Sequence, residues 1–226
     1  MLTLPGPPPV EITLRRSARS RRFSLRVSQL DGRVTLSMPL RARESEAMEF
    51  ARGHESWLRA ALARRPTTQP LQMGGTLLVE GRLLTLDPGT TRSPQILGDS
   101  LLLPGNPDQA APRAAAFLKT LARDRLAAAS DHYATLIGRK VTRITLRDTR
   151  SRWGSCAHDG ALMYSWRLVM APPPVLTYVA AHEVAHMVEM NHSDAFWAVV
   201  TRLYPQWQTQ RKWLHSHGRD LHAYQF

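Results

Sequence analysis

Two runs near the start of the chain alternate hydrophobic and polar residues with the period of a β-strand. In residues 23–27 and 34–38 every second residue is apolar, which is typical of a strand buried on one face. Asp31 and Gly32 lie between these runs, and Asp-Gly is a frequent hairpin turn. The pattern therefore predicts a β-hairpin.

Apolar and turn signals predict further strands and helices along the rest of the chain. Pro66 and Gly138 are expected to end helices, whereas the prolines at 172–174 and Ser193 are expected to begin them. We expect strands at residues 76–79, 82–86, 101–103, 141–146 and 161–165, with a turn at Glu80-Gly81, and helices at about residues 43–64, 111–137, from 172–174 onward, 193–203 and 206–217.

A proline- and glycine-rich break at residues 104–109 is the best candidate for a domain boundary. We expect an α+β protein with a disordered lead-in at residues 1–10, a β-rich N-terminal part at 11–105 and a C-terminal part at 106–226.

Composition bounds the class of protein. Hydrophobic residues make up 43% of the 226 residues, so the chain is expected to fold. Cys156 is the one cysteine, which excludes an internal disulfide and favours a cytoplasmic protein. The proline-rich start predicts no signal peptide, and no apolar run is long enough to predict a membrane span.

The chain carries a formal net charge of +12, and the positive charge is densest near the start. Six arginines and no acidic residue fall between Arg15 and Arg26. This charge favours nucleic acid as a partner of the N-terminal part, while a solvated strand face remains an equal alternative.

One segment has the spacing of a metal site. His182-Glu183-Val184-Ala185-His186 matches HExxH, in which two histidines four residues apart share one helix face. Both imidazoles can then bind one Zn²⁺ ion, and the intervening glutamate can act as the base that activates water. The sequence thus predicts a catalytic role for Glu183.

Catalytic zinc needs a third protein ligand, and Glu189 and His192 are the nearby candidates. Glu189 lies seven residues after His182, about 10.5 Å along a straight helix, which suits convergence on one ion poorly. The spacing therefore favours His192, provided that the chain leaves the helix first. Asn191 is the expected exit residue, because asparagine tolerates the left-handed conformation.

SRWGSC at residues 151–156, followed by HEVAHMVEMNHSDAFW at residues 182–197, resembles the YgjP-like metal-dependent hydrolases, or domain of unknown function 45 family. These are related to WLM and SprT-like zinc proteases. The resemblance runs from about Arg15 to the C-terminal helices. It implies a zincin-like fold, with zinc on the three histidines and Glu183 as the base.

Other residues have two interpretations each. Arg150 or Arg152 can clamp an anionic substrate group near Trp153, or all three can serve packing and fold-specific hydrogen bonds. Cys156 is expected to be a buried side chain rather than a ligand. Residues 163–165 are a candidate sheet edge for pairing with an extended substrate, with a structural strand that binds no ligand as an equal alternative.

Asp194 can orient a ligand imidazole, whereas Phe196 and Trp197 are expected in the core.

The site favours a zinc-dependent metallopeptidase that acts on polypeptides. Two alternatives stay open. A hydrolase of nucleotides or phosphoesters would account for the arginine excess, although no Gly-rich, lysine-containing phosphate loop is present. A nucleic-acid-binding protein with structural zinc would have no use for Glu183.

Overall fold

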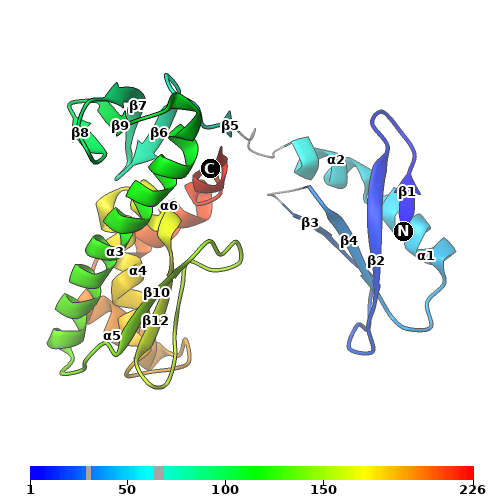
Figure 1. Cartoon of the computed structure of the whole chain (residues 1–226). Coiled ribbons are helices and arrows are strands. Elements are labelled where there is room, and N and C mark those ends of the chain that lie inside the picture. Colours follow the sequence, from blue (N-terminus) through cyan, green and yellow to red (C-terminus); the bar gives the residue numbers. More distant parts are fainter. Residues whose placement is uncertain (29–31, 64–68) are drawn as a thin grey trace. The chain divides into compact units, whose positions relative to one another are not determined.

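The chain forms two compact units, Met1–Thr67 and Thr68–Phe226, in a computed structural model (Figure 1). The structure describes residues 1–28, 32–63 and 69–226. Asp31, in the expected hairpin turn, and Pro66, the expected helix stop, therefore lie outside the described residues. Each unit has a hydrophobic core of its own.

The N-terminal unit is a four-stranded sheet with helices packed against one face. The strands lie in the order β1-β2-β4-β3, and β2 and β4 are parallel. Alternation turns Ile12 and Leu36 toward Ala51 and Leu58 of the helices, where all four are fully buried. The elements are β1 (Leu2–Leu4), β2 (Val10–Arg16), β3 (Ser24–Val27), β4 (Val34–Met38), α1 (Glu44–Gly53) and α2 (Glu55–Ala63).

The structure confirms the pairing of the predicted hairpin and changes two other expectations for this unit. β3 and β4 are antiparallel, with Val27 opposite Val34. Residues 1–10 are not a disordered lead-in, because β1 pairs with β2 and buries Leu4 in the core. The single helix expected at residues 43–64 is broken at His54, whose Nδ1 donates to the carbonyl of Phe50.

The C-terminal unit begins with a second small sheet, in the order β6-β7-β9-β8. Glu80 and Gly81 both have positive φ, 50° and 78°, as a two-residue type I′ hairpin turn requires. This confirms the predicted turn. The strands are β6 (Thr76–Val79), β7 (Arg82–Gly89), β8 (Gln95–Leu97) and β9 (Ser100–Pro104), and β5 (Gln69–Pro70) pairs with β13 (Tyr224–Gln225).

Helices α3, α5 and α6 and strand β11 contact the buried helix α4 (Pro173–Ala185) (Figure 1). Gly138 ends the preceding long helix with φ 62°, and the amides of Gly138 and Arg139 donate to the carbonyls of Thr135 and Ala134. A three-stranded sheet follows in the order β10-β12-β11. The elements are α3 (Ala110–Leu136), β10 (Arg143–Arg147), β11 (Gly154–Cys156), β12 (Ala161–Ser165), α4 (Pro173–Ala185), α5 (Asp194–Leu203) and α6 (Trp207–His217).

The boundary expected at residues 104–109 lies inside the C-terminal unit. Leu84 and Leu103 of the small sheet belong to the same core as Leu118 of α3 and Val179 of α4. The amide of Glu80 also donates to the carbonyl of Val169, 2.7 Å away. A small sheet cannot bury its apolar face alone, so it packs on the helices that follow.

The mixed α and β class is confirmed. Among the described residues, no helix has both the length and the apolar character to cross a membrane.

Candidate metal centre

Helix α4 carries the first two histidines into a buried environment. Nine of its thirteen residues are buried, which explains why its sequence is apolar nearly all round. His182 lies in its last turn and His186 is its C-terminal cap residue. The two rings are 5.1 Å apart, as expected for residues on one helix face.

The chain leaves the helix earlier than expected. Helix α4 ends at Ala185, and the amides of Met187 and Val188 close tight turns on Val184 and Ala185. Among the described residues, Glu80 is the one non-glycine residue with a positive φ. Asn191 is therefore not in the left-handed conformation. The predicted exit at Asn191 is therefore wrong, although the chain does turn back toward the helix.

This return brings His192 to the other two histidines. The Nε2 atoms of His192 and His182 are 3.1 Å apart, and one ligand atom from each of the three histidines lies within 4.8 Å of the others. Two nitrogens bound to one zinc ion at 2.0–2.1 Å with tetrahedral geometry lie about 3.3 Å apart. The three imidazoles thus fit a metal ion of this kind.

Glu189 does not take the position of the third metal ligand for which it was a candidate. Its carbonyl oxygen lies 3.0 Å from Nδ1 of His186. A carbonyl only accepts hydrogen bonds, so Nδ1 carries the proton and Nε2 keeps its lone pair for a metal. The backbone of Glu189 orients His186, and its carboxylate is not in the three-histidine group.

Burial keeps two of the imidazoles neutral. It lowers the pKa of His182 to about 3, with the neighbouring His186 and His192 adding to the effect. Burial also lowers the pKa of His186. Neutral imidazoles are the form that binds metal, so the site is ready to bind near neutral pH.

Helix α5 packs against the three imidazole rings. Its first turn is capped by Ser193, whose Oγ accepts from the amide of Phe196. The fully buried Phe196 ring lies 4.4 to 4.9 Å from the three imidazoles. Trp197 contacts two of them and stacks on Trp207. Phe196 is confirmed as a core residue, while Asp194 is exposed and makes no hydrogen bond to a described imidazole.

Glu183 projects from α4 against β11. A Cβ atom at Gly154 would lie 2.5 Å from Oε1 of Glu183, so only glycine leaves room for the carboxylate. Burial raises the pKa of Glu183 to about 8, and the positive charge of Arg152 opposes this. A cation beside it would lower the pKa again and favour the carboxylate. Sequence reasoning missed Gly154, although it lies within the SRWGSC segment.

The structure separates the residues considered for substrate binding. Arg152 is near enough to Glu183 to lower its pKa, whereas Arg150 acts on Asp148 and His222. Trp153 is partly buried against the core and lies 5.3 Å from the His222 ring. These positions bring Arg152 to the site and give Trp153 a packing role.

Arg167 is buried and pairs with the half-exposed Asp148, an ion pair that sequence reasoning missed. Its Nε and Nη2 donate to the two carboxylate oxygens of Asp148 at 2.7 and 3.0 Å. Its Nη1 donates to the carbonyl of Leu221, and its guanidinium lies 4.8 Å from the centre of the Trp166 ring. Arg167, which follows β12, thus joins the residue after β10 to the C-terminal end of the chain.

The strands beside α4 differ from the expectation for residues 163–165. β12, which holds residues 163–165, is the central strand of its sheet, and the edge strand in contact with α4 is β11. Cys156 in β11 is half-buried and lies outside the three-histidine group. Burial raises the pKa of its thiol to about 11.

A family model for the YgjP-like, metallopeptidase domain matches residues 21–217. The match spans most of the chain. It therefore identifies the class of protein as a metallopeptidase domain. The chain belongs to the YgjP-like family, which confirms the resemblance.

No curated protein matches the sequence. Among solved structures, the metallopeptidase zymogen abylysin of Pyrococcus abyssi is similar at a TM-score of 0.38 and 16% identity, covering 42% of this chain and 96% of that one. A similarity this low carries no argument about fold or function.

Proposed function

We propose that the chain is a zinc-dependent peptidase with a zincin-like catalytic unit, in which His182, His186 and His192 hold the metal and Glu183 is the general base. The convergence of the three imidazoles beside a buried glutamate carries this proposal. A zinc ion held there would polarise the scissile carbonyl and lower the pKa of a water molecule.

The chain's own residues prepare the proton transfer. The Glu183 carboxylate accepts the proton of the attacking water and passes it to the leaving amine. Gly154 leaves space for this carboxylate, and the charge of Arg152 favours its ionised form. His186 keeps the orientation that its hydrogen bond to the Glu189 carbonyl sets.

An extended polypeptide is the substrate that the neighbouring strand suits. β11 is paired with β12 on one side and is the last strand of its sheet. A substrate segment added to its free edge would run past Gly154 and therefore past Glu183. This supports a peptide bond, rather than a phosphoester, as the bond that is cleaved.

The test is cleavage of an unfolded protein, such as β-casein, by the zinc-loaded chain. Glu183→Gln is expected to lower the rate by about 10²- to 10⁴-fold, because it removes the base while keeping the size of the side chain. Undiminished cleavage by this variant would overturn the mechanism. Cleavage of nucleotides instead of β-casein would favour the phosphoester alternative.

Metal content tests the ligand set independently of activity. We expect His192→Ala to lose bound zinc, and Glu189→Ala to retain it because the backbone carbonyl that orients His186 remains. Zinc retained by His192→Ala and lost by Glu189→Ala would assign the third ligand to Glu189.

A further inference from the structure

The sheet of the N-terminal unit has one face that no helix covers within the described residues. Its helices pack on the face that carries Ile12 and Leu36. Alternation along each strand turns the neighbouring side chains to the opposite face. We call this surface the open face. Its residues are Thr3, Glu11, Thr13, Arg15, Ser24, Arg26, Thr35 and Ser37.

The register of the strands arranges these side chains in rows. Thr13, Thr35 and Arg26 lie side by side across β2, β4 and β3. A second row, two residues further along, contains Arg15, Ser37 and Ser24. Each row therefore holds one guanidinium and two hydroxyl groups, and Glu11 is the one acidic residue of the face.

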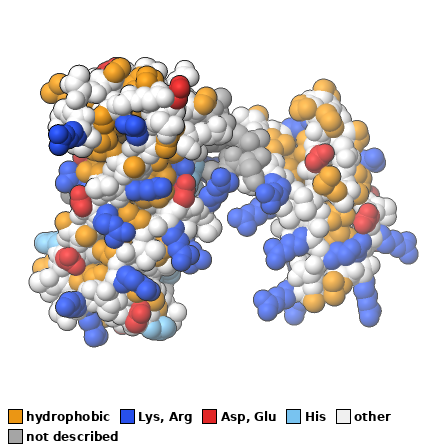
Figure 2. Space-filling model, viewed as in Figure 1, with side chains coloured by type: hydrophobic (Ala, Val, Ile, Leu, Met, Phe, Trp, Pro, Cys, Tyr) orange, Lys and Arg blue, Asp and Glu red, His pale blue; other side chains and the backbone are white. Residues whose placement is uncertain are grey.

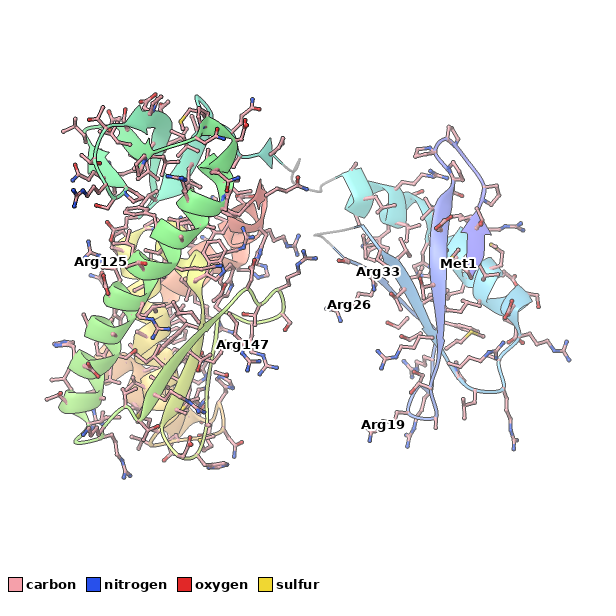
Figure 3. The ribbon with its side chains drawn as sticks, in the orientation of Figure 1. Met1, Arg19, Arg26, Arg33, Arg125 and Arg147 are labelled. Carbon is pink, nitrogen blue, oxygen red and sulfur yellow. The ribbon has the colours of Figure 1, made fainter. Side chains whose placement is uncertain are left out.

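The basic surface continues into the loop that connects β2 and β3. Arg19, Arg21 and Arg22 are exposed there, and Figure 3 shows Arg19 beyond the strand ends, where it extends away from the sheet. Figure 2 shows basic side chains gathered around this unit, with few acidic ones among them. Residues 1–67 contain 13 arginines and 6 acidic residues.

Hydrogen bonds distinguish these arginines from those that hold the unit together. Arg16 donates to the carbonyls of Leu40 and Ala42, and Arg59 pairs with Glu55. The side chains of Arg15, Arg19, Arg21, Arg22 and Arg26, by contrast, make no hydrogen bond or ion pair with another described residue. Their donors are free for a ligand.

The spread of the charges favours a polymer over a small anion. Arg15 and Arg26 lie two strands and two residues apart, which places their Cα atoms about 12 Å from each other. A chain of repeating phosphates meets both positions and the loop together. Arginine and hydroxyl side chains are also the groups that commonly bind phosphate oxygens.

The absence of aromatic rings selects the form of the polymer. The open face carries threonine, serine, arginine and glutamate, and Phe23 instead stacks on Phe50 on the helical side, 5.5 Å away. Proteins that bind single strands without sequence preference stack bases on aromatic side chains. This face has none, so it suits the phosphate backbone of a duplex.

We infer that the open face and the β2–β3 loop of the N-terminal unit bind the phosphate backbone of a nucleic acid duplex without reading its sequence. Arg15, Arg26 and the three loop arginines make the phosphate contacts. The threonine and serine hydroxyl groups of the two rows add hydrogen bonds. This inference does not depend on the peptidase proposal, because it rests on the other unit.

The experiment measures binding of the full chain to duplexes of about 30 base pairs over a range of salt concentrations. Five phosphate contacts predict a slope of about −4.5 for log K against log salt, which is roughly a 500-fold loss between 50 and 200 mM salt. Two duplexes of unrelated sequence are expected to bind equally. No binding at low salt would overturn the inference.

Variants assign the surface. Arg15→Ala/Arg26→Ala is expected to make the slope shallower by about 2, and Arg19→Ala/Arg21→Ala/Arg22→Ala by about 3. The control Arg52→Ala/Arg139→Ala removes two exposed arginines from α1 and from the segment after α3 and should leave the slope unchanged. An equal effect of this control would show that net charge, and not this face, determines binding.

Competition identifies the class of ligand. Polyglutamate is expected to compete poorly, because it lacks the phosphate oxygens. If polyglutamate displaced the duplex at an equal concentration of charged groups, the assignment would be overturned in favour of an acidic polypeptide. Tighter binding of a single strand than of the duplex would overturn the choice of form. Duplex RNA in place of duplex DNA shows which of the two backbones is preferred.

Discussion

At Gly154 the lack of a side chain decides where the Glu183 carboxylate lies. A methyl group there would lie only 2.5 Å from Oε1 of Glu183, which is too close for the carboxylate to stay in place. Since β11 is held by β12 and α4 is buried, neither backbone can easily move away. The glycine in SRWGSC therefore has a positional role that its own chemistry does not suggest.

We expect Gly154→Ala to reduce kcat/KM for peptide cleavage by about 10²-fold, the effect of a displacement near 1 Å in a reacting group. Zinc content should be unchanged, because the three atoms nearest to the added methyl group all belong to Glu183 and none to a histidine. Gly53→Ala is the control, since nothing lies within 4 Å of its added Cβ atom. Full activity of Gly154→Ala would show that Glu183 can move without loss.

The pair of Asp148 and Arg167 makes a prediction about stability and pH. Burial of Asp148 opposes its ionisation, but the hydrogen bonds and charge of Arg167 outweigh this and lower its pKa. Because the folded-state pKa is lowered, the stabilisation is complete above the ordinary value of 3.8 and is lost as pH falls through the lowered pKa.

Asp148→Asn should therefore lower the free energy of unfolding by about 2 kcal/mol at neutral pH, less than for a fully buried pair because Asp148 is half exposed. Urea unfolding at several pH values measures this difference, which should narrow below pH 3.8. Asp99→Asn, in an exposed pair with Arg82, should change little. A difference that stays constant with pH would contradict the assigned role.

At the scale of elements, α4 and α5 build the metal centre together. α4 and its cap residue supply two imidazoles and the Glu183 carboxylate, and the chain after it returns to bring His192 beside them. α5 contributes no ligand but places Phe196 against all three rings. The rings are thus held by packing as well as by the one hydrogen bond to His186.

Phe196→Ala should lower the free energy of unfolding by about 3–5 kcal/mol, because it leaves a cavity in the core. It should also weaken zinc binding, since the imidazoles lose their support. Denaturant unfolding and zinc titration measure the two effects. Val200→Ala removes a fully buried side chain one turn further along α5 and is the control for stability alone. Equal zinc affinities of the two variants would contradict the support that we assign to Phe196.

At the scale of the whole molecule, two separate cores divide the chain. Leu36 lies in the core of the N-terminal unit, and the three-histidine group lies in the C-terminal unit. The core of the C-terminal unit also includes the small sheet of residues 76–104, so the unit that holds the three-histidine group is larger than the sequence suggested.

Leu36→Ala should destabilise the N-terminal unit by about 2–5 kcal/mol. Zinc affinity should stay within about twofold, because no ligand belongs to that core. Circular dichroism during denaturation and zinc titration of the same variant test this. Loss of zinc binding in step with loss of the N-terminal fold would show that the units are energetically coupled.

Local pattern was sufficient for several features of the protein. The alternation in residues 23–27 and 34–38, the Glu80-Gly81 turn and the Gly138 cap each depend on nearby residues, and the structure has them all. HExxH likewise places two histidines and a glutamate on one helix by its spacing alone.

Other features depended on contacts between segments distant in sequence. The contact of Gly154 with Glu183, the pairing of Asp148 with Arg167 and the edge position of β11 join residues whose neighbours along the chain carry no sign of the partner. Helix α4 also ends at Ala185, so the chain leaves it before Asn191. Sequence by itself determined which groups can perform the chemistry, whereas the tertiary structure decided how they are oriented, because orientation arises from burial against other elements.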